Sequence, residues 1–187
     1  MHRKTCRRAN APGDAHELTF SCYKRLPLLS KERTCRWLVE SINKARRQAQ
    51  FDLWAYVVMP EHAHILVCPR VVDYDISEML WRMKQPVGRK AIGFLKQNSQ
   101  IWLEKLTVHR ADGSIARQFW QAGGGYDRNI IEPDTLIRVI DYFHQNPVRR
   151  GLVDLPVEWE WSSARWYAGC RPVPLEMDST LPRTYES

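Results

Sequence analysis

The chain has 187 residues, enough for one well-buried core, and its 44% hydrophobic and 26% charged residues argue against global disorder. Its apolar runs are far too short to cross a bilayer, and its basic start lacks the apolar segment of a secretory signal. Five cysteines without a CxxC pair fit a reducing compartment, so we predict a cytoplasmic protein. The formal charge of +7 favours polyanionic partners such as nucleic acid.

The first part of the chain is predicted to form a loose basic arm, a strand, a helix and a β-hairpin. Ser30 is the expected N-cap of the helix, whose apolar residues recur at helical spacing. The two hairpin strands are joined by a tight turn at Pro60 and Glu61. In chain order, these elements span residues 1–15, 16–23, 31–50, and 51–59 with 62–68.

The second part is predicted to contain two helices and a short strand at 119–121. The first helix spans roughly 76–97 and should be kinked or split by Pro86. The second begins near Pro133 and should end at Asn146, because Pro147 follows. We therefore predict an α+β fold with a central antiparallel sheet and helices packed on it, in one domain over residues 16–169. Residues 170–187 are proline-rich and expected to form a loose tail.

The segment MPEHAHILV, from Met59 to Val67, places two histidines two residues apart in an apolar run. Because a strand alternates its faces, His62 and His64 point to the same side of the predicted sheet. Two imidazoles fixed in this way make half of a metal site. Histidine pairs on the solvent-facing side of a strand also occur without function, so this pattern alone leaves both interpretations open.

The segment DYFHQNPVRRGLV, from Asp141 to Val153, carries a second group of candidate residues. Tyr142 and Asn146 are four residues apart and share one face of the predicted helix. Arg149 and Arg150 follow directly, where they could hold a phosphate group. Taken singly, a helical tyrosine usually serves in packing and an arginine pair usually lies on a solvated surface.

These segments are similar to those of a known family. YVVMPEHAHILV resembles the HUH (His–hydrophobic–His) motif of single-tyrosine transposases, and DYFHQNPVRRGLV resembles the YI-x-x-NPVRAGLV segment of REP-associated tyrosine transposases. FWQAGGGYDRNI and EWEWSSARWY resemble two further segments of this family, in the same order, from about His16 to Tyr167. The resemblance implies a ferredoxin-like HUH endonuclease fold over residues 16–169.

The resemblance also assigns roles to individual side chains. His62 and His64 correspond to metal ligands, Tyr142 to the nucleophile, and Asn146 to a third ligand that offers a side-chain oxygen, with Gln145 as the alternative. Nitrogen and oxygen ligands of this kind fit Mg²⁺ or Mn²⁺. Attack by the tyrosine would leave a 5′-phosphotyrosine and a free 3′-OH, and a second 3′-OH could then rejoin the strands.

The implied function is metal-dependent cleavage and transfer of single-stranded DNA that carries a hairpin, such as a repetitive extragenic palindrome (REP), near the nucleoid. Two alternatives remain: a domesticated protein that binds hairpin DNA without cutting it, and a nuclease that uses water in place of tyrosine. The sequence leaves open whether the protein is a monomer or a homodimer that exchanges its tyrosine helix. Glu61 departs from the asparagine more typical of the family. Three basic pairs are candidates for DNA binding: Arg7 with Arg8, Arg46 with Arg47, and Arg149 with Arg150.

Overall fold

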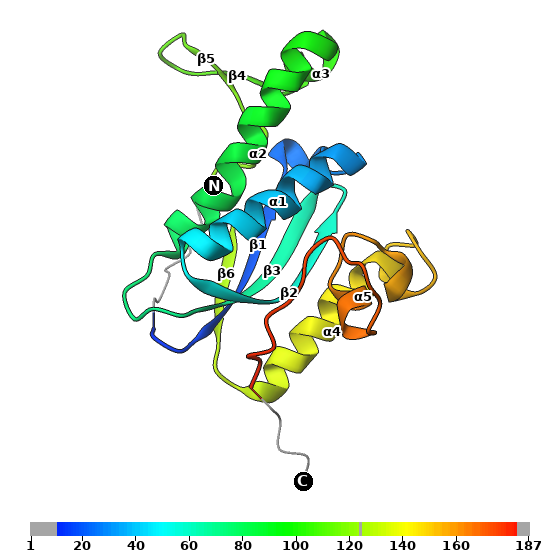
Figure 1. The fold of residues 1–187 in the computed structure, drawn as a ribbon. Helices are drawn as coiled ribbons and strands as arrows, with labels where there is room; N and C mark the ends of the chain where they lie inside the picture. The colour runs from blue at the N-terminus through cyan, green and yellow to red at the C-terminus, as the bar shows by residue number, and fades with distance from the viewer. Residues whose placement is uncertain (1–10, 124, 183–187) are drawn as a thin grey trace.

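A four-stranded antiparallel sheet in the order β2-β3-β1-β6 forms the centre of the fold (Figure 1). The structure is a computed structural model and describes residues 11–123 and 125–182. The sheet and the helices packed on it confirm the predicted α+β class. The four strands are β1 (Ala15–Ser21), β2 (Phe51–Met59), β3 (His62–Pro69) and β6 (Tyr126–Ile130).

Helices cover both faces of the sheet. α1 (Glu32–Gln48) and α2 (Ile76–Asn98) lie on one face, and α4 (Pro133–Arg149) lies on the other (Figure 1). The sheet therefore separates two hydrophobic cores, one beneath α1 and α2 and a smaller one beneath α4. Every residue of β2 is buried, which explains why that strand is apolar apart from Asp52, whose carboxylate pairs with Arg70.

The remaining elements lie around this framework. α3 (Gln100–Lys105) and the hairpin of β4 (Thr107–His109) and β5 (Ile115–Arg117) project beyond the sheet (Figure 1). Two short 3₁₀ helices, η1 and η2, and the helix α5 complete the fold, and they span Tyr23–Arg25, Pro156–Glu158 and Ala164–Tyr167. No helix in the described parts of the chain combines the length and apolarity needed to span a membrane.

Both prolines expected to interrupt helices lie inside them. α2 continues through Pro86, so the predicted split does not occur. The predicted end of α4 at Asn146 is also wrong, because the helix includes Pro147 and runs to Arg149. Pro147 lies in the last helical turn and removes a single hydrogen-bond donor there. The backbone remains hydrogen-bonded beyond it, since Arg150 N–H donates to Asn146 O at 3.1 Å.

Two smaller local predictions also need correction. α1 is capped by Lys31 without a side-chain hydrogen bond, and Thr34 Oγ1 donates to the Lys31 carbonyl at 2.7 Å. Ser30 is therefore not the N-cap. The strand predicted at 119–121 is reduced to an isolated bridge between Trp120 and Cys22.

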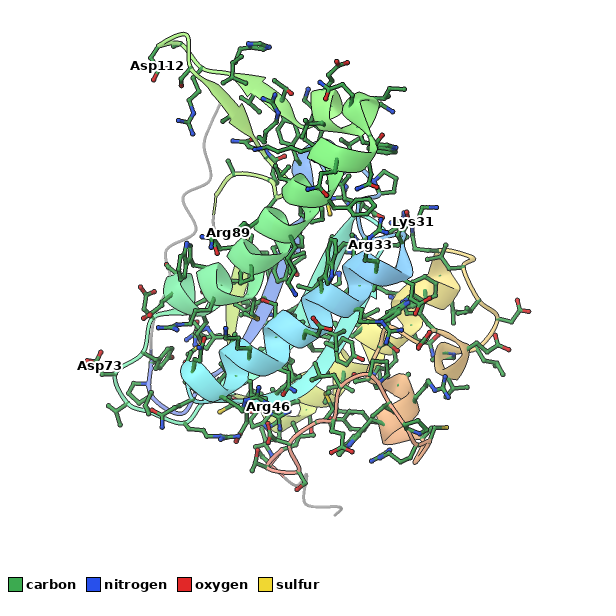
Figure 2. All side chains as sticks on the ribbon, turned by 45° about the horizontal axis from the view of Figure 1, so that its top comes forward. Lys31, Arg33, Arg46, Asp73, Arg89 and Asp112 are labelled. Atoms are coloured by element: carbon green, nitrogen blue, oxygen red, sulfur yellow. The ribbon has the colours of Figure 1, made fainter. Side chains whose placement is uncertain are left out.

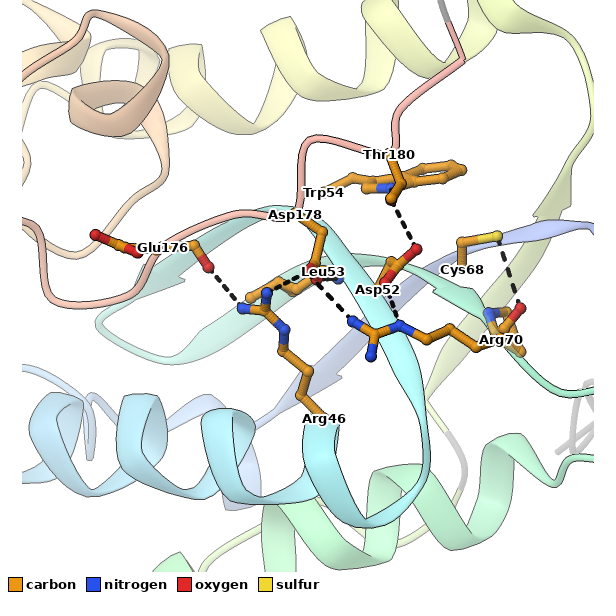
Figure 3. A network of polar contacts seen from close by, with 10 residues as sticks. Arg46, Asp52, Leu53, Trp54, Cys68, Arg70, Glu176, Asp178 and Thr180 are labelled. Carbon is orange, nitrogen blue, oxygen red and sulfur yellow. Dashed lines mark hydrogen bonds and ion pairs between the residues drawn. The ribbon is translucent and has the colours of Figure 1, made fainter.

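The described part of the predicted loose tail, residues 170–182, is packed against the domain. Two of its apolar side chains are buried, and Asp178 forms ion pairs with Arg46 and Arg70 (Figure 3). Asp178 N–H also donates to Leu53 O at 2.9 Å, and its carboxylate accepts from Leu53 N–H at 2.8 Å. The segment thereby covers part of the exposed edge of β2, which composition alone could not reveal.

His144 lies where α4 meets α5. Its ring is 5.3 Å from that of Tyr167, centre to centre, and its Nε2 is 2.9 Å from Ser163 Oγ. Burial lowers the pKa of His144 from its ordinary 6.5 to about 4, although Asp141 acts in the opposite direction. The folded protein therefore keeps this ring neutral at a pH where the unfolded chain takes up a proton.

We expect a fall in pH from 7 to 5 to reduce the free energy of unfolding by about 2 kcal/mol through His144. The loss begins near pH 6.5 and continues towards pH 4, because the lowered pKa makes protonation favour the unfolded chain. His144→Gln removes the titrating group and keeps a hydrogen-bonding side chain. Urea unfolding curves of this variant should show a weaker dependence on pH, and equal slopes for both proteins would contradict the expectation.

Candidate active site

The two histidines of the HAH segment meet on the face of the sheet that α4 covers. The turn between β2 and β3 places His62 at the start of β3, and the period of the strand puts His64 on the same side. Both residues are 7% exposed, and their Nε2 atoms are 3.0 Å apart. The sequence-based prediction that they share one face is therefore confirmed.

The other ring nitrogen of each histidine has its own partner. His62 Nδ1 is 3.2 Å from Glu61 Oε1, and His64 Nδ1 is 2.7 Å from Thr19 Oγ1. This arrangement orients both rings so that their Nε2 atoms converge, as in metal sites where a partner holds the second nitrogen of each ligand. Sequence reasoning missed Thr19, because its pairing with His64 across β1 and β3 joins residues far apart in the chain.

The electrostatic surroundings keep both imidazoles neutral. Burial, together with the neighbouring His62 and Arg25, lowers the pKa of His64 to about 3, and burial also lowers the pKa of His62. Burial alone would raise the pKa of Glu61, but the hydrogen bond and the positive charge of Arg150 help to lower it. Neutral rings beside an ionised carboxylate can offer nitrogen lone pairs to a cation.

α4 brings Tyr142 to the histidines. The ring of Tyr142 is 5.6 Å from that of His64, centre to centre, and Phe143 stacks on His64 at 5.2 Å. Phe143 is fully buried, whereas Tyr142 is 40% exposed. The helix therefore holds the His64 ring with one aromatic side chain and presents a second, accessible one beside it.

Asn146 lies on the part of α4 that faces the histidines. Successive helical residues are about 100° apart, so in projection Asn146 falls between Tyr142 and Phe143, the two side chains that contact His64. Its Nδ2 donates to Tyr142 O at 2.8 Å, which makes the amide oxygen the available end of this buried side chain. Gln145 projects beyond Tyr142 on the other side and is exposed, so Asn146 is the better candidate ligand.

The site could hold a metal ion through two imidazoles and one further ligand. Two ligands at about 2.1 Å from one ion, at a right angle to each other, are about 3.0 Å apart, which matches the two Nε2 atoms. Within residues 11–123 and 125–182, no three His, Cys, Asp or Glu side chains cluster as a metal site would require. A third ligand would therefore be of another type, and the Asn146 oxygen fits this role.

Comparisons with known proteins indicate which family this chain resembles. No protein-family model matches the chain. A Haemophilus influenzae protein described as "Putative REP-associated tyrosine transposase" is 24% identical over 144 residues, which cover 73% of this chain and 76% of that protein. The chain resembles the REP-associated tyrosine transposases. A solved structure described as "REP associates tyrosine transposase bound to a REP hairpin" aligns over 99% of this chain and 100% of the solved chain. The two chains are 21% identical, and the TM-score is 0.69. This match confirms the predicted tyrosine transposase fold.

One predicted basic pair lies at the site of this transposase-like fold. Arg150 Nη1 donates to Glu61 Oε1 at 2.8 Å, so it is anchored to the carboxylate that holds His62. The guanidinium carbon of Arg149 is 5.6 Å from the centre of the Tyr142 ring. Arg149 and Arg150 are both exposed and could approach a phosphate bound at this site.

The other predicted basic residues are not brought to the site. Arg46 lies near the C-terminal end of α1 (Figure 2), and its guanidinium is paired with Asp178. Arg46 and Arg47 precede the start of β2, whereas the histidines follow its end. Nine residues of strand separate these points by roughly 27 Å. Arg7 and Arg8 lie outside the described residues.

Proposed function

We propose that the protein is a metal-dependent endonuclease and strand transferase that acts on single-stranded DNA carrying a hairpin. One observation carries this proposal: two imidazoles converge with their Nε2 atoms 3.0 Å apart, and an exposed tyrosine lies beside them. The likeness to a transposase bound to a REP hairpin supports hairpin DNA as the substrate. The net charge of +7 favours the same polyanion.

His62, His64 and Asn146 would hold Mg²⁺ or Mn²⁺, and imidazole ligands favour Mn²⁺ of the two. Such an ion, when bound, supplies polarisation of the phosphate and stabilises the departing 3′-oxygen. Glu61 and Thr19 hold the two rings in place through their Nδ1 atoms. This support keeps the ligands oriented whether or not DNA is present.

Tyr142 is the proposed nucleophile. Its hydroxyl oxygen attacks the phosphorus as the bond from phosphorus to the 3′-oxygen breaks. The phenolic proton passes to solvent, and the departing 3′-oxygen takes up a proton to become a 3′-OH. The product is a 5′-phosphotyrosine, which a second 3′-OH can attack, restoring the phenol and a phosphodiester. Arg149, over the tyrosine ring, would stabilise the phosphate charge during both steps.

The test is incubation of single-stranded hairpin oligonucleotides, labelled at either end, with Mn²⁺, followed by denaturing electrophoresis. The oligonucleotides form REP-like palindromic hairpins with an unpaired flank. We expect a covalent adduct that carries the 3′-side label, is absent in EDTA, and falls at least a thousandfold in Tyr142→Phe, roughly the loss expected when a covalent nucleophile is removed. Tyr167→Phe is the matched control, because Tyr167 is 39% exposed and its hydroxyl donates to the backbone carbonyl of Trp54 at 2.8 Å.

Two results would overturn the proposed mechanism. Cleavage that persists in Tyr142→Phe, without an adduct, would show that water is the nucleophile. Tight binding of the hairpins with neither cleavage nor adduct in the presence of Mn²⁺ would instead identify a DNA-binding protein without catalytic activity.

A further inference from the structure

Part of the sheet face that carries the histidines is not covered by α4. The helix crosses this face obliquely, from the end of β6 towards the turn between β2 and β3, where Arg150 meets Glu61 (Figure 1). The buried residues beneath it come from β2, β3 and the ends of β1 and β6 near Ala15 and Ile130. The opposite ends of β1 and β6 therefore remain open beside the histidines.

The register of the sheet places Tyr126 in this open area. Residues directly opposite each other in antiparallel strands point to the same side. Thr19 pairs with His64 of β3 and with Tyr126 of β6, so these three residues form one row across the sheet. Neighbouring strands are about 4.8 Å apart, which places the Tyr126 backbone about 10 Å from that of His64. Tyr126 is 49% exposed.

Arg128 lies on the same side of β6, two residues further on. Its guanidinium is fixed by an ion pair of 2.8 Å with Glu17, while 45% of its side chain remains exposed. Between them, Asp127 points to the opposite side and bonds His16 Nδ1 at 2.9 Å, which anchors the strand. β6 thus presents an aromatic ring and a cation, at strand spacing, on a rigid edge next to the candidate active site.

We propose that Tyr126 stacks on an unpaired base of the DNA strand that enters the active site and that Arg128 contacts a neighbouring phosphate. This inference rests on the proposed function. Stacked aromatic rings and cations along one track are the general means of binding single-stranded DNA. Because every base presents a π face, the contact holds a base of any identity and positions the strand without selecting its sequence.

The test measures the coupling between the tyrosine ring and one base. Hairpin oligonucleotides carry a single abasic residue at successive positions of the unpaired flank, and binding is followed by fluorescence anisotropy in EDTA, where no cleavage intervenes. In the wild type, one abasic position should weaken binding by about 5- to 150-fold. Tyr126→Ala should weaken binding of the intact oligonucleotide by a similar factor and be insensitive to that abasic position, whereas Tyr126→Phe should behave as wild type.

Trp81→Ala is the control, because Trp81 is 60% exposed but lies on α2, which packs on the opposite face of the sheet from the histidines. It should keep the abasic profile of the wild type. A thermal unfolding curve checks that Tyr126→Ala is folded. The abasic series measured on the wild type does not depend on that variant. The proposal would be overturned if the loss of affinity in Tyr126→Ala simply added to that of the abasic substitution at every position. It would also be overturned if Trp81→Ala became insensitive to the same abasic position as Tyr126→Ala.

The outcome is separable from that of the proposed function. An adduct on Tyr142 without coupling at Tyr126 leaves the catalytic proposal standing and refutes the stacking one. Coupling without any adduct supports the stacking contact in a protein that binds DNA without cutting it. If the wild type binds none of the hairpins, both proposals fail.

Discussion

Replacing His64 with alanine is expected to weaken Mn²⁺ binding by more than about a hundredfold and to abolish the adduct on Tyr142. Loss of a residue that merely supports a metal ligand already costs about 10- to 100-fold in affinity, so loss of the ligand itself should cost more. Two imidazoles supply both nitrogen atoms of the candidate site, and the described residues offer no cluster of other ligands to replace one. Isothermal titration of the protein with Mn²⁺ measures this loss directly.

A graded series makes the expectation specific. Thr19→Val removes the hydroxyl that contacts His64 Nδ1 and keeps the shape of the side chain, so a loss of about 10- to 100-fold is expected. His16→Gln removes another buried histidine, which bonds Asp127 and Tyr74 on the other side of the sheet, and should leave Mn²⁺ affinity unchanged. If wild type and His64→Ala bind Mn²⁺ with equal affinity, the metal does not bind at this site.

Local patterns sufficed to predict the part of this site that lies on β3. The apolar runs on either side of Pro60 and Glu61 predicted the hairpin, and the period of a strand predicted that His62 and His64 share a face. The spacing of four residues likewise placed Tyr142 and Asn146 on one side of a helix. These predictions held because hydrophobic period and turn chemistry act over a few residues.

Contacts between distant segments were out of reach. Thr19 contacts His64, which lies 45 residues further along the chain. Asp178, near the end of the described chain, forms an ion pair with Arg46, a residue that the sequence predicts to bind DNA. Glu61, which departs from the family pattern, proves to join His62 to Arg150. Strand register and tail packing decide such contacts, and a single sequence displays neither.

Gly125→Ala is expected to lower the free energy of unfolding by about 2–4 kcal/mol. Gly125 has a φ of +73°, and a Cβ at this position would lie 2.1 Å from the carbonyl oxygen of Thr19. That oxygen belongs to the backbone of β1 and cannot rotate away. Alanine must therefore displace the loop or the strand next to the residue that holds His64, so Mn²⁺ affinity should fall together with stability.

Gly123→Ala separates the two causes of this effect. Gly123 also has a positive φ, of +98°, but a Cβ there would meet no atom within 4 Å. Its substitution should therefore cost only the backbone strain, about 1–3 kcal/mol, and leave Mn²⁺ affinity unchanged. Urea unfolding and Mn²⁺ titration of both variants measure whether the contact with β1 adds to the effect of backbone strain. If the two glycines prove equally sensitive and neither affects metal binding, the close approach of Gly125 to β1 does not support the site.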